Sequence, residues 1–112
     1  MRMWLVDPER MCDRHLLGEH FEMHVFCGAL VSGRSMKGYI SAGLVEVSKL
    51  KSRHDELVRE MENRGMKHRS PFGDELQLEC AGKVDSIRSE MLLLARCESC
   101  RVRIRRKELG FL

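Results

Sequence analysis

The sequence predicts an all-α protein, a compact single domain over residues 1–112 with about three main helices joined by irregular loops. Three observations predict this. A length of 112 residues is typical of one domain. Apolar residues recur at helical spacing in three separate segments, as in helices that each turn one side toward a shared core. Alternating strand patterns are scarce, and neither internal repeats nor low-complexity segments are present.

The first helix is expected to begin at Asp7-Pro8-Glu9 and to end near Ser32-Gly33. Asp is a good capping side chain, Pro suits the first helical turn, and Glu complements the positive end of the helix dipole. Gly is the favoured residue just past a helix end. Residues 1–6 are mostly apolar, and we expect them to lie extended across the core.

Two further helices are expected. Residues 33–48 contain three glycines and predict a loop or short helix. The second helix begins at about Ser48 and ends at Gly65, and residues 66–75 (MKHRSPFGDE) indicate a turn-rich linker. The third helix lies somewhere within 84–108. The apolar stripe of the second helix consists of Leu50, His54, Leu57, Val58 and Met61, and that of the third includes Val84, Ile87, Met91, Leu92, Leu94 and Ala95.

Composition excludes several classes of protein. A hydrophobic fraction of 43% and a charged fraction of 33% are typical of a globular chain and not of a disordered one. No apolar run approaches the length of a membrane span, and no signal peptide is visible. We therefore expect a cytoplasmic monomer without a membrane partner. The five cysteines are an odd number, which argues against a disulfide framework in that compartment.

Basic residues are concentrated in the Cys-containing C-terminal segment, residues 96–112. The net charge is only +3, from 20 basic and 17 acidic residues, but five of the basic residues lie within seven positions. Such a cluster can follow a phosphate backbone, and it can equally be a solvated tail. Both interpretations stay open at this point. The five residues are Arg101, Arg103, Arg105, Arg106 and Lys107.

The cysteine and histidine spacings give only weak signals for a metal. Cys97 and Cys100 form half of a zinc motif, but a structural site needs four ligands and no second pair follows them. Two ligands from the histidine-rich first helix could complete a structural zinc site with this pair. The sequence indicates no cofactor that the protein requires. His20 and His24 are four residues apart in "HFEMH". This string differs from the zincin motif, in which Glu directly follows the first His. The spacing of His20 and His24 therefore does not indicate a metalloprotease.

The two carboxylates of the first helix and the terminal amine are further catalytic candidates. Glu19 and Glu22 are three residues apart on the histidine-bearing helix, and their spacing alone favours solvated side chains over an acid–base role. The α-amine has an unperturbed pKa of about 8, so a useful fraction is neutral and nucleophilic. Arg2 is large and should resist methionine removal, which leaves Met1 as the bearer of that amine. Most chain termini, however, are frayed ends without a role.

The segments "DRHLLGEHFEMHVFCGAL" and "LKSRHDELVREMENRGMKH" resemble the bacteriophage endonuclease V type of pyrimidine-dimer DNA glycosylase. The first matches the pattern H-L-x-x-E-x-x-E followed by V-F-x-G-A, and the second matches L-x-x-R-x-x-E-L-x-x-E-x-x-x-R-G. The two stretches occur in the family's order, behind a similar short N-terminal lead. The resemblance covers residues 1 to about 70.

The resemblance implies a compact all-α DNA-repair glycosylase with AP-lyase activity on damaged duplex DNA such as pyrimidine dimers or abasic sites. It places the Schiff-base nucleophile at the amine of Met1 and the catalytic carboxylate at Glu22. Phe21 and Val25 stand where the family has basic residues, so the resemblance does not determine which DNA lesion is the substrate. The expected DNA contacts are Arg2, Arg14, His15, Arg101, Arg103 and Arg105. One alternative is a non-catalytic DNA-binding module on the same scaffold, stabilised by zinc at Cys97 and Cys100. Another is a small interaction protein without a nucleic-acid role.

Overall fold

The computed structural model describes residues 1–73 and 77–112, and every regular element within those ranges is helical. The prediction of an all-α fold is therefore confirmed. The elements in chain order are η1 (Pro8–Arg10), α1 (Asp13–Val31), α2 (Lys37–Ser41), η2 (Val47–Lys49), α3 (Leu50–Asn63), α4 (Ser86–Arg96) and α5 (Glu98–Glu108), where η denotes a single turn of 3-10 helix.

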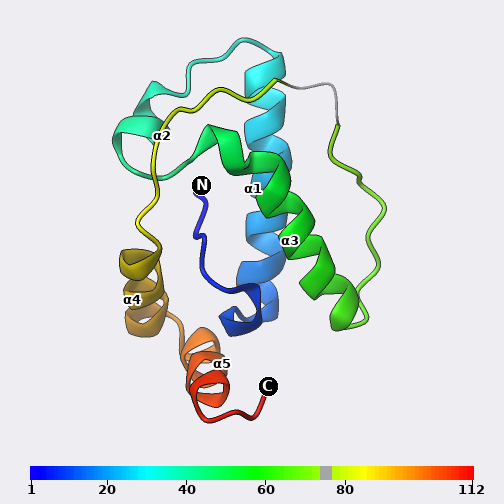
Figure 1. Cartoon of the computed structure of the whole chain (residues 1–112), viewed down its shortest axis with the longest axis vertical. Coiled ribbons are helices and arrows are strands. Elements are labelled where there is room, and N and C mark those ends of the chain that lie inside the picture. The colour runs from blue at the N-terminus through cyan, green and yellow to red at the C-terminus, as the bar shows by residue number, and fades with distance from the viewer. Residues whose placement is uncertain (74–76) are drawn as a thin grey trace.

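Helix α1 is the axis around which the other elements are arranged (Figure 1). Helix α3 packs along α1, and α5 packs against η1. The N-terminal segment, residues 1–6, lies beside α1 without forming a helix, as expected. Its backbone is fixed by a hydrogen bond of 2.7 Å from the Met3 amide to the Leu44 carbonyl. Met3 is fully buried, together with Leu16, Met23, Phe26, Leu50 and Leu57 of the core.

The start of the first helix differs from the sequence prediction. Asp7 does act as a cap, accepting a hydrogen bond from the Glu9 amide, but it caps only the single turn η1. The chain then becomes extended at Met11, and α1 begins at Asp13 with Cys12 as its cap. Arg64 holds this break, because its Nη2 atom donates to the carbonyl of Met11 at 2.7 Å. The predicted start at Asp7 is therefore wrong, since a tertiary contact interrupts the helix.

The ends of the first two helices are as predicted. Helix α1 ends at Val31 and is followed by Gly33 in the left-handed region at φ 71°, and α3 ends at Asn63 before Gly65 at φ 81°. A side chain other than glycine is strained in that conformation, which is why glycine marks these ends. The described part of the predicted linker, residues 66–73, contains no helix, and Asp74 and Glu75 lie outside the described residues.

The C-terminal region contains two helices where one was predicted. Helices α4 and α5 are separated at Cys97, whose backbone is extended at φ −126° and ψ 110°. The apolar periodicity continues across this residue, so it gave no signal of the break. In the described part of the chain, no helix combines the length and the apolar character that crossing a membrane requires.

Candidate functional site

The terminal amine and Glu22 lie together. The Met1 nitrogen is 4.0 Å from Oε1 of Glu22, and the Arg2 backbone amide donates to Oε2 of the same carboxylate at 3.2 Å. Glu22 projects from the middle of α1, and the buried side chain of Met3 fixes the segment that carries the amine. The two groups that were predicted as nucleophile and carboxylate are therefore neighbours in space.

The environment of Glu22 favours proton exchange with its surroundings. Burial raises the pKa of the half-buried Glu22 carboxyl, while the Arg2 amide and the terminal ammonium act in the opposite direction. A carboxyl group in this situation is suited to giving and taking protons. An amine within a few ångströms of such a group can also be deprotonated by it.

Arg2 is held in place by two other elements. Its guanidinium lies over the Trp4 ring at 4.1 Å, and its Nη2 atom donates to Oγ of Ser89 at 2.6 Å. Ser89 is a fully buried residue of α4. Burial lowers the pKa of the Arg2 guanidinium. The α4 helix, which lies outside the region of family resemblance, therefore positions a residue next to the terminal amine.

A pocket of about 330 Å³ opens beside Arg2. Lys83 and Arg88 line it together with Arg2, and Asp85 is the acidic residue in its wall. Three cations around one pocket are suited to a phosphate group. The sequence prediction missed Lys83 and Arg88, because their approach to Arg2 depends on how the segment after residue 80 returns to the N-terminus.

Glu19, the other carboxylate on this helix, is not available for chemistry. It is buried, and Arg53 of α3 donates to both of its oxygens, from Nε at 2.7 Å and from Nη2 at 2.8 Å. The expectation that Glu19 is solvated is therefore wrong. A two-pronged pair of this kind is a strong structural contact.

The other predicted DNA contacts are not gathered around Arg2. Arg14 is exposed and lines a separate pocket of about 510 Å³. Arg103 lines the same pocket, and its Nε atom donates to the Glu9 carbonyl at 2.8 Å. Arg101 donates to the Leu94 carbonyl at 2.8 Å, and Arg105 is exposed on α5. The part of the C-terminal basic cluster that folds back onto the protein thus has internal partners.

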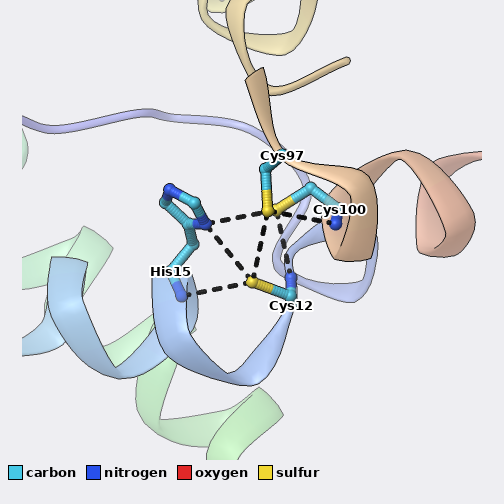
Figure 2. Close-up of side chains that lie close together, drawn as sticks. All are labelled: Cys12, His15, Cys97 and Cys100. Atoms are coloured by element: carbon cyan, nitrogen blue, oxygen red, sulfur yellow. Dashed lines mark hydrogen bonds between the residues drawn. The ribbon is translucent and has the colours of Figure 1, made fainter. Parts of the chain in front are cut away.

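His15 lies in a cluster with three cysteines, as Figure 2 shows. Its Nδ1 atom is 3.3 Å from the sulfur of Cys12 and 3.5 Å from that of Cys100. The sulfurs of Cys12 and Cys97 are 3.9 Å apart. All four candidate ligand atoms lie within 4.8 Å of one another, and this cluster can bind a metal ion.

The three separations given above are close to the edges of a tetrahedral zinc site. Bonds of about 2.3 Å to sulfur and about 2.0–2.1 Å to nitrogen give edges of about 3.8 Å between sulfurs and about 3.5 Å between sulfur and nitrogen. A disulfide would require about 2.05 Å between sulfurs, and among the described residues none of the five cysteines is oxidised to one.

The backbone around the cluster also favours thiolates. Cys12 caps the N-terminus of α1, and Cys97 caps that of α5. The Cys12 amide donates to the sulfur of Cys100 at 3.3 Å. Positive helix ends and N–H donors stabilise the deprotonated sulfur that binds metals, whereas burial raises the pKa of the Cys100 thiol to about 12.

The partner of the Cys97–Cys100 pair was missed in the sequence although a signal was present. Cys12-x-x-His15 has the same two-residue spacing as Cys97-x-x-Cys100, but it precedes that pair by more than 80 residues. The sequence placed two further ligands on the histidine-rich helix; of the residues that meet Cys97 and Cys100, His15 belongs to α1 and Cys12 caps its start. His20 and His24 instead face α3, where they meet His54 and His68 in a second cluster.

Comparison with known proteins identifies the family. A family model described as pyrimidine dimer DNA glycosylase matches residues 1–74, which is more than half of the chain. Searches of curated proteins and of solved structures gave no match. The matched region contains the amine, Arg2 and Glu22, as well as one half of the cysteine–histidine cluster.

Proposed function

Because the chain belongs to the pyrimidine dimer DNA glycosylase family, we propose that it is a DNA-repair enzyme with both glycosylase and AP-lyase activity on damaged duplex DNA. In this proposal the Met1 amine is the nucleophile and Glu22 is the catalytic carboxylate. The observation that carries the proposal is the 4.0 Å separation between the amine and the carboxylate. Separations of this size are common before substrate tightens a site.

The residue types match the glycosylase step. The neutral amine attacks the sugar C1′ as the glycosidic bond breaks, and the damaged base leaves with the bonding electrons. Positive charge builds on the sugar in this step, and the Glu22 carboxylate stabilises it. Loss of the nitrogen proton and opening of the C1′–O4′ bond then give an imine. C1′ is hidden in the stacked duplex, so a nucleotide has to leave the stack.

The lyase step uses the same two groups. The imine acidifies the C2′ proton, Glu22 takes that proton, and the 3′ phosphate leaves with its C–O electrons. Water then hydrolyses the imine and restores the free amine. Arg2, with Lys83 and Arg88 in the adjoining pocket, is placed to hold a neighbouring phosphate during both steps.

Borohydride trapping tests the nucleophile. Reduction of the imine should join the protein covalently to abasic DNA, and peptide mapping should place the adduct on the Met1 nitrogen. Intact mass should show Met1 present with an unblocked amine. One extra residue ahead of Met1 should abolish trapping while leaving the melting temperature unchanged.

The Glu22→Gln variant tests the carboxylate. We expect strand cleavage to fall by about 100-fold or more, since general acid–base groups contribute that much, with DNA binding retained. Glu62→Gln on exposed α3 surface is the control with the same charge change. A wild-type protein that forms no adduct and nicks neither irradiated nor abasic DNA would contradict the proposal. Salt-sensitive DNA binding without an adduct would instead favour the non-catalytic binding module.

We further propose that Cys12, His15, Cys97 and Cys100 hold a structural zinc ion. Four protein ligands fill a tetrahedral shell and leave no open position for substrate, which is typical of structural sites. Elemental analysis should find less zinc in Cys97→Ser than in the wild type, and the wild-type amount in Cys80→Ser, which changes an exposed cysteine outside the cluster. Equal zinc contents in the two variants would contradict this assignment.

A further inference from the structure

The four histidines other than His15 meet in one place. His20 and His24 come from α1, His54 from α3, and His68 from the segment that follows α3. One ring nitrogen from each lies within 4.8 Å of the others. Every histidine of the chain therefore belongs to one of two clusters, and the proposed chemistry uses none of these four.

We propose that His20, His24, His54 and His68 form a second metal centre, which binds a divalent first-row transition metal, zinc in the first instance, and fastens residues 66–72 to α1 and α3. Neutral imidazole is a ligand that suits zinc, copper, iron and nickel. The centre has nitrogen donors only, and this separates it chemically from the cysteine–histidine cluster.

Three orphaned nitrogens carry the argument. The Nε2 atoms of His20, His24 and His68 are buried, and none of them has a hydrogen-bond partner among the described residues. Buried polar atoms in folded proteins are nearly always paired, so three orphans in one cluster require an explanation. A metal ion that accepts the lone pair of each nitrogen satisfies all three at once.

His54 has the partner that a metal ligand usually needs. Its Nδ1 atom lies 2.9 Å from Oδ1 of Asp55, so a proton on Nδ1 is held by a carboxylate. This leaves the Nε2 lone pair for an ion, as in the carboxylate–histidine–metal arrangement. The same Nε2 atom lies 3.2 Å from the Ser70 carbonyl oxygen, and an ion bound to Nε2 would replace this contact.

The geometry allows an ion at the centre. Four points no more than 4.8 Å apart fit inside a sphere of radius about 2.9 Å, and side-chain shifts of about 1 Å bring them to the zinc–nitrogen distance of about 2.0–2.1 Å. Phe72 is buried against His24 and His54 and shields this side of the cluster.

The placement of the centre on α1 gives it a positioning role. His20 and His24 are one helical turn apart and share a face, whereas Glu22 lies between them in sequence and faces the terminal amine. An ion bound to His20 and His24 would fix α1 against α3 on the side of α1 opposite the terminal amine.

Metal content of the wild-type protein is the first test. After loading with zinc and removal of unbound ion, we expect two zinc ions per chain by elemental analysis. X-ray absorption should then show three sulfur and five nitrogen ligands over the two ions, in line with the two clusters. A single zinc per chain, with sulfur in its shell, would overturn the proposal.

Matched variants locate the second ion. His68→Gln lies in a segment without helix, so its loss of a ligand should leave the fold intact. It should bind one zinc, and its cobalt form should keep the thiolate-to-cobalt absorption of the other site. Lys67→Gln, the exposed neighbour, should still bind two. If His68→Gln and His20→Gln both bind two zinc ions, the four histidines are not the ligands.

A third variant examines the nitrogen-only shell directly. Cys97→Ser combined with Cys100→Ser should retain one zinc, and its absorption spectrum should contain only nitrogen scattering at about 2.0 Å. Sulfur in that spectrum, or no bound zinc in a variant that still melts cooperatively, would count against the centre. None of these measurements depends on DNA cleavage, so this proposal and the glycosylase proposal can fail separately.

Discussion

Arg53 joins three parts of the molecule through one guanidinium. It pairs with Glu19 of α1, donates to the Val6 carbonyl of the N-terminal segment at 2.8 Å, and contacts Glu56 on its own helix at 2.5 Å. The side chains of Arg53 and Glu19 are 2% and 0% exposed. This contact therefore fixes the helix that bears Glu22 relative to the segment that bears Met1.

Replacing Arg53 should have a large effect on stability. Arg53→Met leaves the Glu19 carboxylate buried without its cation, and we expect a loss of about 3–5 kcal/mol in the free energy of unfolding. Urea denaturation monitored by helical circular dichroism measures this. Arg59→Met, on the exposed side of the same helix, should change stability by about 0.5 kcal/mol or less. Equal effects of the two changes would show that the buried pair is not a main contact.

Sequence reasoning reached some of these residues and not others for a clear reason. The Met1 and Glu22 pair followed from the family resemblance, which carries information about three-dimensional neighbours. The spacing of Glu19 and Glu22 shows only that they belong to neighbouring turns of one helix. Arg53 lies 34 residues from Glu19, and no local pattern reports that approach.

At the scale of elements, local signals predicted where helices end better than where they break. The glycines after α1 and α3 were recognised, and Asp85 caps α4 by accepting from the Arg88 amide at 3.1 Å. No glycine marks the breaks at Cys12 and Cys97. A proline, Pro8, lies near the first break, and none lies near the second. At both breaks a cysteine sulfur caps the next helix while facing the cluster. Tertiary contacts set these boundaries, and periodicity cannot report them.

Two glycines should respond in opposite ways to a methyl group. Gly82 has a φ of 83°, and an added Cβ would lie 2.2 Å from the Val45 carbonyl oxygen. Gly28 is inside α1 with nothing within 4 Å of the added atom. We expect Gly82→Ala to cost about 1–3 kcal/mol through backbone strain and the clash, and Gly28→Ala to stabilise by about 0.5–1 kcal/mol. Thermal melting of the two variants shows whether each change raises or lowers stability. A stabilised Gly82→Ala would contradict the position of residues 81–84 against Val45.

At the scale of the whole molecule, the cysteine–histidine cluster joins the two ends of the chain. It connects the start of α1 to the start of α5, residues that are 85 positions apart between Cys12 and Cys97. A chain of 112 residues buries a modest core, and the binding of a structural metal ion adds to its folding free energy. Arg2 depends on the same connection, because α4 supplies Ser89 beneath it. A metal ion at the cluster would therefore influence the amine site through α4.

Removal of that ion should loosen the C-terminal helices first. Metal binding contributes directly to folding free energy, so Cys97→Ser should lower the melting temperature by about 10 °C or more, which corresponds to about 2 kcal/mol in a chain of this size. Limited proteolysis followed by mass spectrometry should find the earliest cuts within residues 86–112. Cys80→Ser should melt and be cut like the wild type, as its side chain is exposed and outside both clusters. DNA affinity should fall in Cys97→Ser and not in Cys80→Ser, because a loosened α4 no longer supports Arg2 through Ser89. If Cys97→Ser releases zinc but leaves melting and proteolysis unchanged, core packing alone holds α4 and α5 in place.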